Sequence, residues 1–259
     1  PRSAAVARSG GSVVSYWTNA ILQAVRAGSV PPPAATRAFA AAQTAGFVAA
    51  NGTNPRYATP FAVGSGPRDA DVDAAYAAAF AQAATVIMGR DFTPALSRYF
   101  AQTGGGDARA VQWGTQVGQS IAGSRQSDGS ANAATLDTFR YPKQMDAMGW
   151  EPTSDGRQAL LPGWGKVRPW VIGDARQFLP RPFPSVNSAE FARQYNKVKA
   201  LGGANSTIRT ADQTQAAFFW EDGPGGVTPP GHWQLIAIRL LEGRNLDTVE
   251  YARAMALLS

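Results

Sequence analysis

His232 is the only histidine of this chain, and it shares a turn-rich segment with two adjacent carboxylates, Glu221 and Asp222. An imidazole near carboxylates can transfer protons or hold a metal ion, so these three residues are the first candidates for chemistry. Their spacing matches no established pattern of metal ligands. A serine hydrolase would need a Gly-x-Ser-x-Gly turn, which the sequence lacks. We therefore expect His232 to pack at the start of a helix, and it stays the only candidate site residue.

The segment from Trp220 to Trp233 separates two predicted helices. A helix that begins near Ala211 is expected to end at Trp220, where a run rich in glycine and proline follows. The next helix is expected to begin at Thr228, with its hydroxyl as the N-cap and Pro229 as the first helical residue. A proline is tolerated there because the first N–H groups of a helix have no partner within it.

This run and its flanks resemble the family of vanadium-dependent haloperoxidases. Those enzymes share a helical architecture with the type 2 phosphatidic acid phosphatases and the bacterial acid phosphatases. The resemblance is most specific from Trp150 onward, and the segments that carry it outside the run are 14–19, 31–37, 161–170, 190–202 and 206–213.

The resemblance implies that the chemistry lies in a C-terminal part of the protein. The family's motifs are a lysine seven residues before Arg-Pro, then Pro-Ser-Gly-His, then Ser-Arg followed by Gly-x-His. They supply a lysine, two arginines and a backbone N–H for the oxygens of vanadate or phosphate, and two histidines as ligand and acid–base partner. The vanadate cofactor is thus expected to have its ligands outside this chain.

This sequence departs from those motifs. It has one histidine where the family needs two, and Pro230 precedes Gly231-His232 where the family has serine. Arg168-Pro169 has Leu161 at the position of the family's lysine, and Arg181-Pro182 has Asp174 there. We therefore expect no catalytic, cofactor-binding or metal residue in the chain, which alone should be inactive.

Three functional hypotheses remain open. The first is the N-terminal helical portion of a haloperoxidase, which oxidises halide with hydrogen peroxide at a histidine-bound vanadate. The second is an acid phosphatase of the same superfamily, and the third is a helical interaction module without catalysis. A portion that packs on a C-terminal continuation should expose a large apolar face, whereas an independent module should have a polar surface.

The last predicted helix, from Leu246 to Ser259, has apolar residues at helical spacing but no glycine or basic residue to end it. We expect this helix to pack against helices outside the sequence. Val249, Ala256 and Leu257 would then lack neighbours within the chain.

Composition excludes several classes of protein. The 259 residues are 44% hydrophobic and 16% charged, which is typical of a globular protein. The net charge of +6 comes from dispersed residues rather than from basic runs, so nucleic acid is not an expected partner, whereas a small oxyanion or halide is. No apolar run is long enough to cross a membrane. A second copy of the chain is a further candidate partner.

The absence of cysteine excludes disulfides and thiolate sites but indicates no compartment. The chain begins without methionine and without a signal-like apolar segment, so we expect it to be processed or trimmed. The resemblance implies a periplasmic or extracellular location.

The apolar periodicity predicts an all-α fold, a helical bundle formed as one domain over residues 1–259. Helices are expected over 12–27, 34–50, 71–89 and 107–122, and again from Asn187, where Asn187 and Glu190 form a capping pair, and from Thr210 with Gln213. Residues 123–187 form an irregular segment rich in Pro, Gly and Trp, with at most one short strand pair around Val167–Ile172. Gly114 and Gly118 favour a close helix contact, and Trp17, Trp113 and Trp220 are expected between helices.

Overall fold

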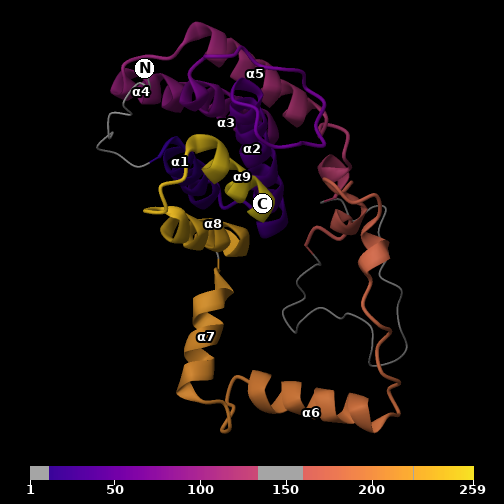
Figure 1. The fold of residues 1–259 in the computed structure, drawn as a ribbon. Helices are drawn as coiled ribbons and strands as arrows, with labels where there is room; N and C mark the ends of the chain where they lie inside the picture. The colour runs from indigo at the N-terminus through magenta and orange to yellow at the C-terminus, as the bar shows by residue number, and fades with distance from the viewer. Residues whose placement is uncertain (1–11, 134–159, 224) are drawn as a thin grey trace. The chain divides into compact units, whose positions relative to one another are not determined.

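The computed structural model describes residues 12–133, 160–223 and 225–259, and it confirms the all-α class (Figure 1). These residues contain no strand, and none of their helices is long and apolar enough to cross a membrane. The α-helices are α1 (Val13–Ala27), α2 (Pro32–Thr53), α3 (Val72–Met88), α4 (Thr93–Thr103), α5 (Ala108–Gly123), α6 (Ala189–Gly202), α7 (Ala211–Glu221), α8 (Thr228–Leu241) and α9 (Thr248–Leu258).

The chain divides into two compact units. The first unit holds the described residues up to Arg168 together with residues 225–259, and the second unit is Pro169–Gly223. The first unit therefore contains α1–α5, α8 and α9, and the second contains α6 and α7. The organisation as a single domain stays a prediction.

The core of the first unit is formed by α2, α3 and α5, which contact one another closely. Both α2 and α3 are rich in alanine, and their small side chains are buried along most of each helix. On α5, Gly114 and Gly118 lie against the backbone of α3: a Cβ at position 118 would lie 2.6 Å from the carbonyl oxygen of Ala79. The predicted close approach at these glycines is confirmed, and it brings three helices together with few large side chains between them.

Helix starts follow the capping signals in the sequence. Ser12, Asp71 and Asp107 accept hydrogen bonds from backbone N–H groups in the first turns of α1, α3 and α5. Thr210 and Asp247 form full capping boxes with Gln213 and Glu250, at the starts of α7 and α9. Short polar side chains satisfy the free N–H groups at these ends, which is why the predicted helices are confirmed to within a few residues.

Several details of the predicted elements are wrong. The N-cap of α6 is Ser188 rather than Asn187, because the Ser188 hydroxyl accepts from the backbone N–H of Phe191 at 3.1 Å. Helix α4 was not predicted, although Pro94 near its start and Gly104 in the left-handed region at its end mark its bounds. The strand pair around Val167–Ile172 does not form, and Pro169 removes a donor that a strand would need.

The predicted irregular segment over 123–187 includes residues 134–159, which lie outside the described part. Its described residues hold only short 3₁₀ turns, at Ser130–Asn132, Trp164–Lys166 and Ala175–Phe178. Such turns match the density of proline and glycine in this segment.

The large apolar residues singled out in the sequence divide into two groups. Trp17 and Trp113 are buried between helices, as predicted, and the indole N–H of Trp113 donates to the carbonyl oxygen of Ala49 at 3.0 Å. Trp220 is 46% exposed, so its predicted burial is wrong. Val249 is buried within the first unit, which corrects the expectation that it lacks neighbours, whereas Leu257 is exposed.

Candidate functional site

His232 is half-buried in the second turn of α8. This helix begins differently from the prediction: its N-cap residue is Val227, and no side chain caps it. Thr228 adopts a φ of 69°, and its buried hydroxyl has no hydrogen-bond partner among the described residues. Pro230 contributes to this difference, because it removes one of the two N–H groups from which a Thr228 cap could accept and leaves only that of Gly231.

Glu221 and Asp222 belong to the second unit, whereas His232 belongs to the first. Among the described residues, no group of three or more histidine or acidic side chains is arranged to hold a metal ion. The three residues that opened the sequence analysis therefore carry no proposal of metal chemistry.

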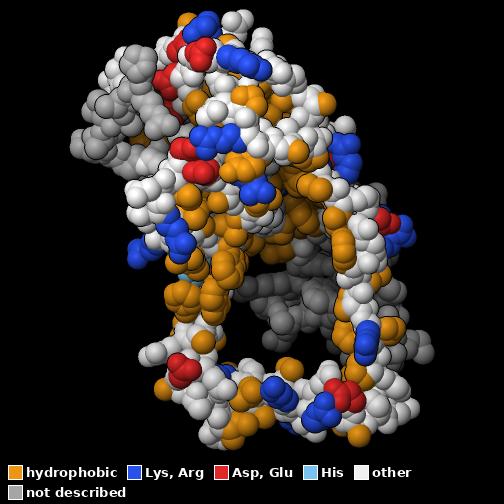
Figure 2. All heavy atoms as spheres, viewed as in Figure 1, with side chains coloured by type: hydrophobic (Ala, Val, Ile, Leu, Met, Phe, Trp, Pro, Cys, Tyr) orange, Lys and Arg blue, Asp and Glu red, His pale blue; other side chains and the backbone are white. Residues whose placement is uncertain are grey.

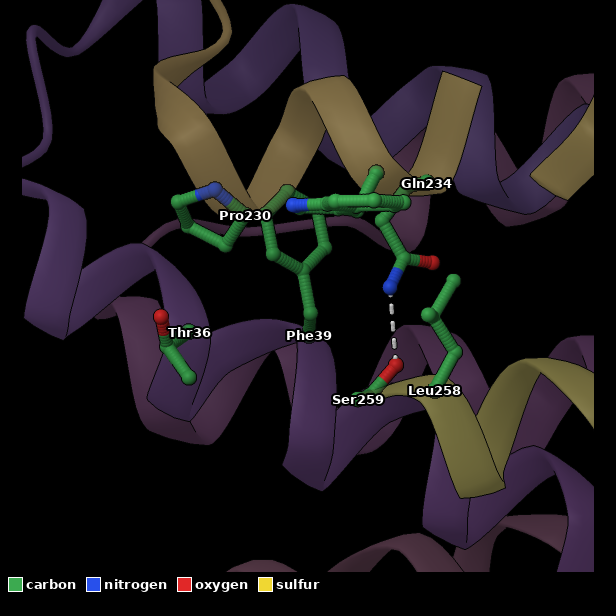
Figure 3. A pocket seen from close by; sticks show the side chains of 7 residues that line it. Thr36, Phe39, Pro230, Gln234, Leu258 and Ser259 are labelled. Carbon is green, nitrogen blue, oxygen red and sulfur yellow. Dashed lines mark hydrogen bonds between the residues drawn. The ribbon is translucent and has the colours of Figure 1, made fainter. Parts of the chain in front are cut away.

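A pocket of about 420 Å³ opens between α2, α8 and α9 in the first unit, and we call it the α2–α8–α9 pocket (Figure 3). Most of its wall is apolar. The side chains of Gln234 and Ser259 point toward one another across it, and they are joined by a hydrogen bond of 2.9 Å from Gln234 Nε2 to Ser259 Oγ. Its lining residues are Thr36, Phe39, Pro230, Trp233, Gln234, Leu258 and Ser259.

Behind the pocket, buried polar side chains form a continuous network. The hydroxyl of Tyr76 donates to Gln43 Oε1 at 2.8 Å. Gln43 Nε2 donates to Thr18 Oγ1 at 2.9 Å and to Gln234 Oε1 at 3.2 Å. Burial raises the pKa of Tyr76 well above its usual range, so its hydroxyl stays a neutral donor. The network therefore fixes the orientation of the Gln234 amide at the floor of the pocket.

Sequence reasoning did not identify this pocket. Its residues come from positions 36–39, 230–234 and 258–259, and no motif links them. The one available signal was the Pro-Pro-Gly-His-Trp run, which places Pro230 and Trp233 near the start of one helix.

Three arginines and one carboxylate gather at the end of α5. Arg37 Nε donates to Asp128 Oδ2 at 2.8 Å, and Arg37 Nη2 donates to the carbonyl oxygen of Arg125 at 2.7 Å. Arg125 Nη1 donates to the carbonyl oxygen of Arg168 at 3.1 Å, and Arg168 donates to that of Ser124. Arg37 and Arg168 bind the carbonyl oxygens of the two residues that follow α5, and Arg125 binds the carbonyl oxygen of Arg168. The cluster therefore acts as a clamp rather than as a cradle for an oxyanion. Arg37 and Arg168 both lie in segments that carry the family resemblance.

The clamp makes stability depend on pH. Burial alone would raise the pKa of Asp128, but hydrogen bonds from Arg37 and Ser130 outweigh it and hold the pKa below its ordinary value. Because the pKa of Asp128 is lower in the folded state, its carboxylate stabilises the folded protein at pH values above the unfolded-state pKa of about 3.9. This stabilisation is lost as the pH falls through the folded-state pKa.

We expect Asp128→Asn to lower the free energy of unfolding by about 2 kcal/mol at pH 7, because it removes the buried partner of Arg37. The loss should shrink as the pH falls below 4. Urea unfolding followed by circular dichroism at pH 7, 5 and 3 measures it, with the exposed Asp69→Asn as control. An equal loss at every pH would contradict the role of the carboxylate charge.

Apolar side chains are exposed on the first unit along α8 and at the end of α9. Trp233 and Leu240 lie two turns apart on one face of α8 and are 50% and 60% exposed. Leu257 and Leu258 are exposed at the end of α9. Figure 2 shows hydrophobic side chains gathered over α8 on the visible face. We call these four residues the α8–α9 apolar surface.

The second unit has no buried residue at all. Neither α6 nor α7 has a buried residue. Three exposed aromatic residues follow one another at the end of α7: Phe218, Phe219 and Trp220. The other large apolar residues exposed in this unit are Val171, Ile172, Phe178, Leu179, Phe183, Val186, Tyr195, Val198 and Ile208. Helices without a buried face gain little stability in water.

Comparison with protein-family models gives no match, and neither does comparison with curated proteins. Among solved structures, the chain is similar to the crystal structure described as the first bacterial vanadium-dependent iodoperoxidase. The TM-score is 0.77 at 21% sequence identity, and the match covers 94% of this chain. It covers 64% of the other chain, so the present chain spans less than two thirds of that protein.

Proposed function

We propose that this chain, which has the helical fold of a vanadium-dependent iodoperoxidase, is the N-terminal helical portion of a haloperoxidase-like enzyme. Such an enzyme would oxidise halide with hydrogen peroxide at a vanadate held by a C-terminal part. The match in fold over 94% of this chain and only 64% of the other carries the proposal.

The residues of this chain do not fit a vanadate site of the kind that the resemblance implies. That site needs two histidines, and the sequence has only His232. The Arg37, Arg125 and Arg168 side chains already bind carbonyl oxygens and a carboxylate. In this proposal the chain therefore supplies structure, and the C-terminal part supplies the ligands and the chemistry.

The exposed apolar residues favour the hypothesis that this chain is a portion of a larger enzyme over the hypothesis that it is an independent interaction module. The α8–α9 apolar surface and the uncovered side chains of the second unit are costly in water, and a stand-alone module would replace them by polar residues. We propose that the C-terminal part covers them. A periplasmic or extracellular location is part of the same proposal, and cell fractionation would test it.

The experiment compares the 259-residue chain alone with the same chain joined to its C-terminal continuation. Vanadate binding is measured by ⁵¹V NMR, iodide and bromide oxidation by absorbance in the presence of hydrogen peroxide, and phosphatase activity with 4-nitrophenyl phosphate. We expect the chain alone to bind no vanadate and to catalyse neither reaction, whereas the longer protein binds vanadate and oxidises halide. Phosphate ester hydrolysis without halide oxidation would assign the protein to the phosphatase branch instead.

His232→Gln provides the matched variant. In the longer protein we expect it to leave vanadate binding unchanged and to lower the free energy of unfolding by at most about 1 kcal/mol, because in this proposal His232 has a structural role in α8 and is no ligand. Loss of vanadate binding with an intact circular dichroism spectrum would make His232 a ligand and overturn the proposed division between the two parts.

A further inference from the structure

We infer that the α2–α8–α9 pocket is the docking site at which the C-terminal part of the protein anchors a large apolar side chain on the first unit. This docking rests on the proposed function, in which the C-terminal part covers the α8–α9 apolar surface. It adds the pocket that holds the anchor and the kind of side chain that fills it.

The pocket opens on the α8–α9 apolar surface. Trp233 and Leu258 belong to both, since each lines the pocket and they are 50% and 41% exposed. Pro230 lines the pocket from α8, and the buried Phe39 lines it from α2 (Figure 3). An element that covers this surface therefore also closes the pocket, and burial of the half-exposed indole stabilises the contact.

The lining of the pocket selects an apolar side chain. None of the seven lining side chains is charged, so a charged group would lose its hydration there without gaining a counter-ion. The polar side chains of Gln234 and Ser259 are already joined to each other by a hydrogen bond. An aromatic or aliphatic side chain would bury its surface against Phe39 and Trp233, in a volume of about 420 Å³.

The pocket is held in shape by the core behind it. Gln234 is only 2% exposed, and its Oε1 accepts a hydrogen bond from the fully buried Gln43. A site that is already ordered loses little entropy on binding, and protein contacts are anchored by large side chains in pockets of this kind.

The comparison with the iodoperoxidase structure favours the C-terminal part as the occupant. The match covers 64% of that chain, so the other protein has further residues from which such a cover can be formed. A second copy of the present chain is the alternative occupant, and the experiment separates the two.

The test compares the 259-residue chain with the longer protein, both labelled with fluorotryptophan, by ¹⁹F NMR. Trp233→Phe assigns the Trp233 resonance. In the chain alone this resonance should shift between normal and heavy water, because the indole is exposed, and in the longer protein the shift should be lost. A shift that persists in the longer protein would overturn the inference. So would a shift that the chain alone loses as its concentration rises, since the occupant would then be a second copy.

Thr36→Phe blocks the pocket from an exposed position of α2. In the longer protein it should lower the midpoint of urea unfolding by about 0.5 M, because the added ring competes with the anchor for space. Gln102→Phe is the matched control, since it adds the same ring at an exposed position of α4, which does not line the pocket. Equal midpoints for the two variants would show that nothing docks in the pocket. This comparison needs only the longer protein, so it decides even if the chain alone is unfolded.

Failure of the docking site can be told apart from failure of the proposed function. If the longer protein binds vanadate but Trp233 keeps its solvent shift, the proposed function stands and the docking site is wrong. If Trp233 loses its solvent shift in the longer protein but no vanadate binds, the docking site stands and the haloperoxidase chemistry is wrong.

Discussion

Gly114→Val should lower the free energy of unfolding by about 3 kcal/mol or more, among the largest effects of any single substitution in the first unit. A Cβ at this position would collide with the carbonyl oxygen of Ala75 and lie 2.9 Å from the Cβ of Ala78. The obstacle is backbone of α3, which cannot rotate away as a side chain could. The helices would have to separate, and the packing of α2 against both would loosen with them.

Urea unfolding followed by circular dichroism measures this effect. Gly123→Ala is the matched control on the same helix, because a Cβ there has no neighbour within 4 Å. Helix propensity predicts that the control is neutral or stabilising by up to about 1 kcal/mol. If Gly114→Val proved as stable as the control, the close contact between α3 and α5 would be wrong.

Gln43→Leu should lower the free energy of unfolding by about 3 kcal/mol. The Gln43 side chain is fully buried and hydrogen-bonds with Tyr76, Thr18 and Gln234. Leucine fills similar space but leaves the Tyr76 hydroxyl without its acceptor and Gln234 without its donor. A buried polar group that loses its partner costs about 1–3 kcal/mol.

A double-mutant cycle with Tyr76→Phe tests whether the cost arises in the network. Tyr76→Phe alone should cost about 1 kcal/mol, and the double variant should cost less than the sum of the two single variants, since one shared bond is lost only once. Chemical unfolding of all four proteins measures the cycle. Additive losses would show that Gln43 and Tyr76 are not coupled.

The helices could be predicted because their signals are local. Apolar spacing located α1, α3 and α5, and the capping pair of Thr210 and Gln213 marked the start of α7. Gly114 and Gly118, four residues apart, indicated a close contact on one face of α5. Two helix starts misled: Asn187, where Ser188 is the cap, and Thr228, where the prediction weighed the hydroxyl and neglected the missing N–H of Pro230.

The candidate site could not be predicted in the same way. The α2–α8–α9 pocket and the Arg37–Asp128 clamp join residues that are far apart in the sequence, and spacing carries no information about such contacts. Trp220 shows a second limit. Its apolar side chain favoured burial, but burial also requires tertiary packing that sequence does not show, and the side chain is 46% exposed.

Helices α8 and α9 pack on α1 and α2 across nearly the whole length of the chain. Such contacts have a high contact order, and forming them requires closure of a long loop before any stabilisation is gained. During synthesis, α1–α5 leave the ribosome first, and the places that Val249 and Met255 fill on them stay vacant until the last turn of α9 emerges. The N-terminal helices must therefore remain soluble as an incomplete core while the later part of the chain is made, which makes this interval the stage at which aggregation competes with folding.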